Sequence, residues 1–490
     1  MRLKNLPVLC TLILSLLATR QSAQTALQTA IKTFLKDDNL ANASVSISIL
    51  DVSSGKMLAS HQPDLSLAPA SSLKVVTTAT AMSLLGPDYT FKTELQYDGS
   101  IDRNGQLHGN LYLKGYGDPT LGSDQMQEAP GLDAVMEKFR LALQQKGIRK
   151  INGHVVGDAS WFGTDVNCDT WQWNDLGNYY AAGIWGLNIH ENLYYLRFRQ
   201  TSRLGAIPAI GSIETYIEGL AFYNEVTSAG RGTGDNAYIY GAPYDFTRYV
   251  RGTIPVGSQL FSIKGSMPDP PLFAAQYLRA SLEEVGIPSS DEATTQLELE
   301  RRGKANDSRT TFYSYHSPDL EKIVRRANMK SVNLYCESLL KTISKARNGD
   351  GSLESGTKIL LEYWEDRGVN TRGVFLDDGS GLSARNAVTT RFMVQLLRKK
   401  TKDKDFEACY NSIPVDGEDG PLRNTLKGTA AEGRLSAKSG TIKRVRSYTG
   451  YARTRTGNLR AFSIIVNNYS GSGGAIRKRM ETLMLAFVKD

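Results

Sequence analysis

Near its N-terminus the chain alternates hydrophobic and polar residues in a way that predicts a helix, a hairpin and a second helix. Residues 25–36 carry apolar side chains at helical spacing. Residues 43–50 alternate serine with apolar residues, the pattern of a half-buried strand, and KMLAS at 56–60 is the expected hairpin partner. Residues 71–85 then show a mostly apolar helical pattern that stops at a Gly-Pro pair.

The middle of the chain, residues 96–299, has a different composition and pattern. It is rich in Gly, Tyr, Trp, Asn and Asp, with short predicted strands at 111–115 and 153–159 and one clear helix after Pro271. This pattern indicates one or two mostly β modules inserted into another domain.

After this insert the helical pattern returns. We predict helices at 331–345, 356–366 and 386–400, strands at 434–438, 445–452 and 459–467, and a closing helix at 475–488. Together with the N-terminal elements, these segments indicate one α/β (α+β) domain that is split in sequence into residues 24–95 and 300–490.

The first 23 residues have the layout of a secretory signal. Arg2 and Lys4 precede an apolar run from Leu6 to Ala18, and small residues follow it. That run is shorter than the roughly 20 residues that span a bilayer. We therefore expect cleavage near Ala23, export to the periplasm (or to the outside of a single-membrane envelope), and at most peripheral membrane association. A retained membrane anchor is the alternative.

Composition and charge narrow the classes of function. The 490 residues are 41% hydrophobic and 22% charged, which is ordinary for a globular protein and excludes a disordered or multi-span membrane chain. The net charge of the full sequence is +8. Removal of residues 1–23 takes away Arg2, Lys4 and Arg20, which leaves 55 of the 58 basic residues and all 50 acidic ones, a net charge of +5. An exported chain without a clustered basic stripe is not expected to bind nucleic acid.

Cysteine and histidine usage argues against a disulfide scaffold and against a metal site. Outside the signal the cysteines are Cys168, Cys336 and Cys409, so at most one disulfide can form. The five histidines lack the spacing of metal ligands, and no dinucleotide or phosphate-loop motif is complete. We expect neither a metal nor a cofactor.

A serine followed three residues later by a lysine can supply a nucleophile and its base. Residues i and i+3 share a helix face, and a buried lysine can lose its proton and then accept one from the serine. The spacing occurs at Ser53/Lys56, Ser71/Lys74, Ser338/Lys341 and Ser355/Lys358. Only Ser71 opens an otherwise apolar helix, where its backbone N–H can face an oxyanion. Ser53 lies in a predicted turn, and we expect Lys341 and Lys358 to be solvated.

Two further motifs follow the Ser71 motif along the chain. They are Ser331-Val332-Asn333 at the start of a predicted helix, and Lys438-Ser439-Gly440, followed by Thr441, at the edge of a predicted strand. Each motif alone has an ordinary alternative. Ser71 or Ser331 could be a helix cap, and the Lys438 motif could be a turn at the end of a strand. A serine–lysine pair, Ser-x-Asn and Lys-Thr-Gly in this order are the signatures of penicillin-interacting serine enzymes.

With these motifs the sequence resembles the class C low-molecular-mass penicillin-binding proteins, the D-alanyl-D-alanine carboxypeptidase/endopeptidase family. Further stretches that resemble this family are LKGYGDPTL (113–121), GDASWFG (157–163), DLGNYYAAG (175–183), GTIPVGS (252–258), SMPDPPLFA (266–274), SVNLYCESLLK (331–341) and DDGSGLS (377–383). Ser439 stands where the family usually has threonine, so the hydroxyl is kept. The resemblance implies a transpeptidase-like domain, with an antiparallel sheet flanked by helices, and two nested, mostly β insert domains, the inner one at about 190–262.

The resemblance also implies a role for each motif residue. Ser71 is the expected nucleophile, Lys74 its base, and Ser331 the relay that passes a proton to the leaving amine. The substrate-binding residues that it implies are Asn333 for the acyl-side amide and Lys438, Ser439 and Thr441 for the terminal carboxylate. Asp158 resembles an acidic residue that approaches the active site in this family, with a surface-turn aspartate as the alternative. Asp378 and Ser380 are expected to shape a turn beside the site.

The implied activity is that of a serine DD-peptidase. It would hydrolyse D-Ala-D-Ala and D-Ala-diaminoacyl bonds of peptidoglycan stem peptides through an acyl-enzyme, with β-lactams as covalent inhibitors. Two alternatives stay open. A β-lactamase on the same scaffold would need a dedicated deacylating base, and a non-catalytic penicillin- or peptidoglycan-binding protein would lack one of the motif residues.

Overall fold

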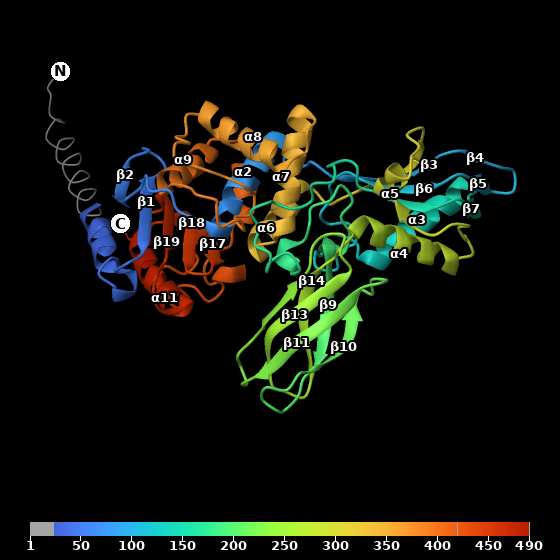
Figure 1. Ribbon diagram of the computed structural model, residues 1–490. Coiled ribbons are helices and arrows are strands. Elements are labelled where there is room, and N and C mark those ends of the chain that lie inside the picture. Colours follow the sequence, from blue (N-terminus) through green and yellow to red (C-terminus); the bar gives the residue numbers. More distant parts are fainter. Residues whose placement is uncertain (1–23, 419, 490) are drawn as a thin grey trace, which may run out of the picture. The chain divides into compact units, whose positions relative to one another are not determined.

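The computed structural model describes residues 24–418 and 420–489, so the predicted signal lies outside the described residues. The chain forms two compact units (Figure 1). Among the described residues, the first unit consists of 24–87, 324–331, 357–418 and 420–489, and the second unit consists of 88–323 and 332–356. Two helices, α6 (Leu320–Lys330) and α8 (Leu353–Asp366), run across the division along the chain.

The first unit is built on a five-stranded antiparallel sheet with the strand order β17-β18-β19-β1-β2. Its strands are β1 (Ser44–Asp51), β2 (Met57–His61), β17 (Leu435–Ile442), β18 (Val445–Arg453) and β19 (Leu459–Asn467). They occur where the sequence predicts the hairpin and the meander. Because β1 pairs with β19, the N-terminal and C-terminal parts of the split domain share one sheet, as Figure 1 shows by the blue and red strands lying side by side.

Helices cover both faces of this sheet. The helices are residues 24–34, α2 (Lys74–Leu85), α9 (Thr390–Lys400), α10 (Phe406–Ser412) and α11 (Gly473–Met484). Residues 24–34 and α11 share a hydrophobic core with one face of the sheet, and α9 packs with the other face. The predicted half-buried β1 is therefore buried on both faces. Ser46 and Ser48 do not face solvent, because their Oγ atoms lie 2.7 and 2.9 Å from Oγ1 of Thr390 on α9.

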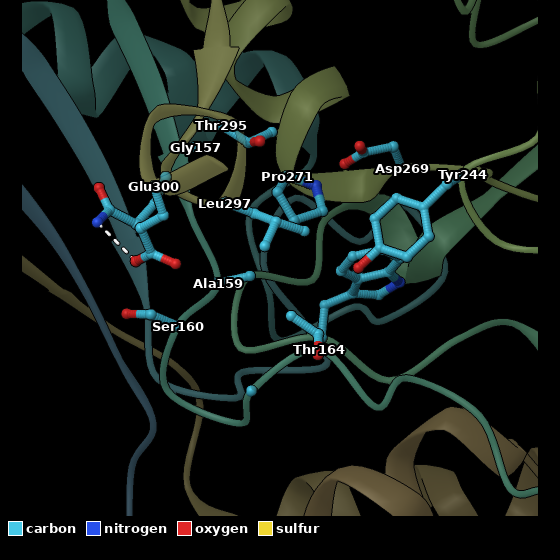
Figure 2. Close-up of a pocket in the computed structure, with 13 residues that line it drawn as sticks. Gly157, Ala159, Ser160, Thr164, Tyr244, Asp269, Pro271, Thr295, Leu297 and Glu300 are labelled. Atoms are coloured by element: carbon cyan, nitrogen blue, oxygen red, sulfur yellow. Dashed lines mark hydrogen bonds between the residues drawn. The ribbon is translucent and has the colours of Figure 1, made fainter. Parts of the chain in front are cut away.

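The second unit is centred on a mixed sheet with the order β15-β8-β6-β3-β16. The strands are β3 (Lys92–Tyr97), β6 (Leu111–Gly115), β8 (Val155–Asp158), β15 (Thr294–Thr295) and β16 (Thr310–His316), and the helices are α3 (Leu132–Lys146), α4 (Pro270–Glu284), α5 (Gln296–Arg301) and α7 (Asn333–Asn348). Strands β6, β8 and β15 run parallel. A cavity of about 310 Å³ lies at the carboxyl ends of β8 and β15 (Figure 2).

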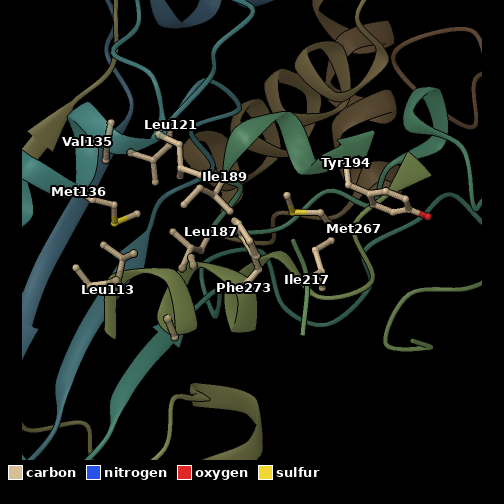
Figure 3. Packing of buried hydrophobic residues seen from close by; sticks show 14 of the residues in the cluster. Leu113, Leu121, Val135, Met136, Leu187, Ile189, Tyr194, Ile217, Met267 and Phe273 are labelled. Carbon is tan, nitrogen blue, oxygen red and sulfur yellow. The ribbon is translucent and has the colours of Figure 1, made fainter. Parts of the chain in front are cut away.

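Three smaller sheets complete the second unit. One has the order β4-β5-β7, and residues 193–266 form the other two, with the orders β10-β9-β14 and β11-β13-β12. The strands are β4 (Ser100–Ile101), β5 (Gln106–His108), β7 (Lys150–Asn152), β9 (Leu193–Arg199), β10 (Ala209–Glu214), β11 (Ala221–Ala229), β12 (Asn236–Tyr240), β13 (Thr247–Pro255) and β14 (Leu260–Ser266). One hydrophobic core joins them to the mixed sheet, with Leu113, Ile189 and Phe273 among its buried side chains (Figure 3).

Two features of the second unit differ from the sequence prediction. The unit extends beyond the expected insert of 96–299. Strand β16 follows residue 300 in the sequence, yet it pairs with β3 and so belongs to the mixed sheet of this unit. The insert is also less purely β than expected. Helix α3, which the prediction missed, buries Val135, Phe139 and Leu143 along one face.

Candidate active site

The Ser71 motif lies at a short helical turn that leads into α2. Residues Ala70–Leu73 form a 3₁₀ turn, and α2 begins directly at Lys74. Residues i and i+3 are eclipsed in a 3₁₀ turn, so the two side chains share a face. Nζ of Lys74 lies 3.1 Å from Oγ of Ser71 and donates a hydrogen bond of 2.8 Å to the carbonyl oxygen of Ser380. Lys74 is fully buried and Ser71 is half-buried, which leaves the hydroxyl accessible beside its lysine.

The backbone that presents Ser71 is strained and tightly packed. Ala70 has φ of 46°, a left-handed conformation that costs a non-glycine residue about 1–2 kcal/mol. A Cβ on Gly381 would lie 2.0 Å from the carbonyl oxygen of Ala70, and a Cβ on Gly440 would lie 2.5 Å from that of Pro69. Two glycines from distant motifs therefore allow the chain to approach the serine turn closely.

Replacement of Gly381 by alanine is expected to destabilise the protein by more than about 2 kcal/mol and to slow acylation by a penicillin. Its φ of 82° strains any alanine, and the contact with Ala70 must also move. Gly428→Ala is the matched control, because Gly428 has φ of 74° but no atom within 4 Å of the added Cβ. Urea unfolding and the acylation rate measure both effects. Equal stabilities and acylation rates for the two variants would show that the contact is unimportant.

The serine of the second motif and the lysine of the third meet in the first unit. Nζ of Lys438 donates hydrogen bonds of 2.9 Å to Oγ of Ser331 and to the carbonyl oxygen of Ser439. Ser331 follows α6 and has φ of 57°, another left-handed residue at a motif serine. Lys438 is fully buried on β17, so its cationic end is held by these oxygens rather than by bulk water. The three motifs thus form two serine–lysine pairs within the first unit.

Strand β17 lies at the edge of its sheet, and Ser439 and Thr441 of the third motif face that edge. Ile442 and Val445 close a two-residue hairpin as a hydrogen-bonded pair. Because bonded and non-bonded pairs alternate along an antiparallel ladder, Ser439 and Thr441 direct their backbone groups away from β18. Such an edge can bind an extended peptide by backbone hydrogen bonds.

The remaining predicted site residues, Asn333 and Asp158, belong to the second unit. Asn333 begins α7, and its Nδ2 donates a 2.7 Å hydrogen bond to the carbonyl oxygen of Tyr180. Asp158 ends β8, is 1% exposed, and forms ion pairs with Arg309 at 2.6 Å and with Lys114 at 3.7 Å. It is therefore not a surface-turn aspartate, and its contact with a substrate stays a prediction.

A loop after α8 shapes the site through its backbone. Asp378 accepts hydrogen bonds from the backbone N–H groups of Gly381 and Ser383, at 2.7 and 2.6 Å. The loop carbonyls of Gly379 and Ser380 accept hydrogen bonds from Thr77 and Lys74 on α2. The expectation that Asp378 and Ser380 shape a turn is confirmed. The contact through the Ser380 carbonyl was not predicted, since a backbone acceptor has no sequence signal of its own.

The other serine–lysine spacings are not paired in this way. The side chain of Lys358 is 76% exposed, as expected. Lys341 corrects the prediction: it is 1% exposed, because α7 is buried along most of its length. It donates to the carbonyl oxygen of Asp165 at 2.5 Å, and Oγ of Ser338 has no hydrogen-bond partner among the described residues. Spacing alone therefore does not make a reactive pair.

Burial lowers the pKa of Lys341 from 10.5 to about 8. Below pH 8 both the folded and the unfolded chain hold this proton, and the penalty for the buried charge is constant. Between pH 8 and 10.5 the unfolded chain binds more protons, so stability rises with pH. We expect wild type to gain up to about 3 kcal/mol across this window relative to Lys341→Met. Denaturant unfolding at several pH values measures the difference, and parallel pH profiles would contradict it.

Neither a metal centre nor a disulfide is found among residues 24–418 and 420–489. No group of three or more His, Cys, Asp and Glu side chains there could hold a metal ion. Cys168, Cys336 and Cys409 are buried thiols outside any disulfide. In the same part of the chain, no helix is long and apolar enough to cross a membrane.

Comparison with known proteins places the chain in a family. The sequence model of the D-Ala-D-Ala carboxypeptidase 3 (S13) family matches residues 27–487. The chain is 30% identical over 461 residues to a D-alanyl-D-alanine carboxypeptidase of an Actinomadura species, which covers 91% of this chain and 82% of that protein. It is 25% identical to D-alanyl-D-alanine carboxypeptidase DacB of Haemophilus influenzae, over 86% and 84% of the two chains.

The solved structures agree on the fold. Penicillin binding protein 4 of Haemophilus influenzae superposes with a TM-score of 0.78 at 22% identity, which covers 92% of this chain and 97% of that one. The fold of this chain is thus one that a solved structure already shows. With the family match over nearly the whole described chain and the three motifs in place, the chain belongs to the D-Ala-D-Ala carboxypeptidase 3 (S13) family.

Proposed function

We propose that this protein is a serine DD-peptidase in which Ser71 forms an acyl-enzyme with peptidoglycan stem peptides. The observation that carries the proposal is the 3.1 Å contact between Oγ of Ser71 and Nζ of Lys74, a lysine that is fully buried. Burial favours the neutral form of a lysine, which can then accept the proton of the serine hydroxyl.

In acylation, Oγ of Ser71 attacks the carbonyl carbon of the D-Ala residue that precedes the scissile bond. The Oγ–C bond forms, the C–N bond breaks, and the hydroxyl proton passes through Lys74 and Ser331 to the leaving amine. Lys438 supports this relay, since its ammonium donates to Ser331 at 2.9 Å. Water then attacks the ester and releases the shortened peptide.

Backbone and side-chain groups around the serine bind the substrate in this proposal. The N–H groups of Ser71 and Thr441 form the oxyanion hole; the direction of the Thr441 backbone at the β17 edge supports its part. Lys438, Ser439 and Thr441 bind the terminal carboxylate, and Asn333 binds the acyl-side amide. Asp158 also contributes to substrate binding.

The proposed substrates are the D-Ala-D-Ala end of stem peptides (carboxypeptidase activity) and the D-Ala-diaminoacyl cross-link (endopeptidase activity). Both offer a D-alanyl carbonyl to the same serine. β-Lactams acylate Ser71, and the resulting ester is hydrolysed slowly. The predicted export signal at residues 1–23 would place the enzyme beside peptidoglycan, in the periplasm or outside a single-membrane envelope.

Digestion of purified peptidoglycan, with products identified by mass spectrometry, tests this function. We expect release of D-Ala and conversion of cross-linked dimers to monomers. Hydrolysis of nitrocefin without D-Ala release would indicate a β-lactamase instead. Binding of penicillin without any peptide product would indicate a non-catalytic binding protein.

A further inference from the structure

The cavity in the second unit lies where an α/β sheet commonly binds a ligand. Gly157, at the end of β8, and Thr295, at the end of β15, both line it, and these strands run parallel. Asp269 and Pro271 line it from the start of α4. Open α/β sheets bind ligands at the carboxyl ends of their parallel strands. The four residues of the serine–lysine pairs do not line this cavity, so the proposed peptidase function does not account for it.

The charge of the lining selects the class of ligand. Of the described residues that line the cavity, Asp269 and Glu300 are acidic, and none is lysine, arginine or histidine. Figure 2 shows the two carboxylates on opposite sides, with Leu297 and Pro271 between them. A phosphate or a carboxylate would be repelled at both ends. A molecule with a positive charge at each end and an apolar middle matches this arrangement.

Among the described residues, Asp269 makes no direct ion pair, and Arg301 acts on it only from a greater distance. One oxygen accepts the backbone N–H of Leu272 at 2.9 Å, which caps α4, and no ion pair forms within the described part of the chain. Burial raises its pKa to about 6, while the nearby Arg301 lowers it and itself contacts Glu298 at 4.0 Å. A cation in the cavity would stabilise the ionised carboxylate.

Aromatic rings and a second carboxylate complete the site. The rings of Trp185 and Tyr244 meet edge to face, with centroids 5.0 Å apart, and both line the cavity near Asp269. Ammonium groups bind favourably over such rings. On the opposite side, one oxygen of Glu300 accepts a 2.8 Å hydrogen bond from Gln296, and the side chain lies at an exposed rim.

We propose that this cavity binds a linear diamine or polyamine. One ammonium group lies at Asp269 beside the Trp185 and Tyr244 rings, the other lies at Glu300, and the methylene chain packs on Leu297 and Pro271. Ser160, Thr164, Thr295 and Gln296 also line the cavity, so its polarity alone does not define the ligand. The two separated carboxylates, with no basic side chain among the described residues of the lining, define it by two positive charges.

Isothermal titration calorimetry of the full chain with putrescine, cadaverine and spermidine tests this site. We expect saturable binding of at least one amine, binding of butylamine that is about tenfold weaker, and no binding of butanediol, which has no charge. Asp269→Asn and Glu300→Gln are each expected to weaken binding about tenfold. Asparagine keeps the helix cap, and Glu300 is exposed, so both variants are expected to fold.

Glu283→Gln is the matched control, because Glu283 is an exposed carboxylate on α4 and does not line the cavity. Its affinity should equal that of wild type. Absence of heat with every amine would overturn the proposal. So would wild-type affinity in both the Asp269→Asn and the Glu300→Gln variant, or heat only with a stem peptide that carries a diamino acid. Because penicillin acylation does not use these residues, failure here leaves the peptidase function untouched.

Discussion

Replacement of Ser71 by alanine is expected to lower the rate of D-Ala release from a stem pentapeptide by at least about 10⁴-fold. The hydroxyl of Ser71 supplies the oxygen of the acyl-enzyme ester. The alanine variant has no oxygen at this position, and the nitrogen of Lys74 cannot form that ester. Substrate binding should change much less, because the carboxylate-binding groups of β17 are untouched. Steady-state kinetics with D-Ala detection measures the effect, and folding is checked by urea unfolding.

Ser53→Ala is the matched control for this variant. Ser53 also has a lysine three residues later, but it is exposed in a turn, where its Oγ donates to Asp51 at 2.7 Å. Its removal should leave the rate of D-Ala release unchanged. A Ser71→Ala enzyme that keeps more than about one-tenth of the wild-type rate would refute the assignment of the nucleophile.

Replacement of Lys74 by alanine is expected to slow acylation about 10²–10⁴-fold, the usual contribution of a general base. The alanine removes the Nζ that lies 3.1 Å from Oγ of Ser71 and also breaks the bond to the Ser380 carbonyl. The loss should diminish as the pH rises, because hydroxide can take over part of the proton removal. Stopped-flow acylation by a chromogenic β-lactam, followed over pH, measures both effects.

Lys358→Ala serves as the control, since Lys358 has the same spacing to a serine but is mostly exposed. It should acylate at the wild-type rate at every pH. A Lys74→Ala enzyme whose rate falls by a constant factor at all pH values would indicate that the lysine acts by holding the Ser380 loop rather than by accepting a proton.

The sequence predicts much of the catalytic unit because its signals are local. The hairpin of β1 and β2, the meander of β17 to β19 and the helix after Ser71 follow from periodicity over a few residues. The order and context of the motifs singled out Ser71 from four equal spacings. The contact between Lys438 and Ser331 confirms that the second and third motifs come together.

Other features depend on distant contacts, which periodicity does not encode. The burial of Ser46 and Ser48 requires α9, more than three hundred residues away along the chain. The boundary near residue 300 depends on the pairing of β16 with β3. Lys341 was expected in solvent because a lysine is seldom fully buried. Each difference arises where tertiary packing overrides a local pattern.

Peptide mapping of the penicillin adduct tests the covalent chemistry at Ser71 most directly. The protein is incubated with benzylpenicillin, digested, and analysed by tandem mass spectrometry, with Ser71→Ala treated in parallel. We predict one modified peptide, heavier by the mass of one benzylpenicillin, with fragments that place the adduct on Ser71, and no adduct in the variant. An adduct on Ser331 or Ser338, or undiminished labelling of Ser71→Ala, would contradict the proposed mechanism.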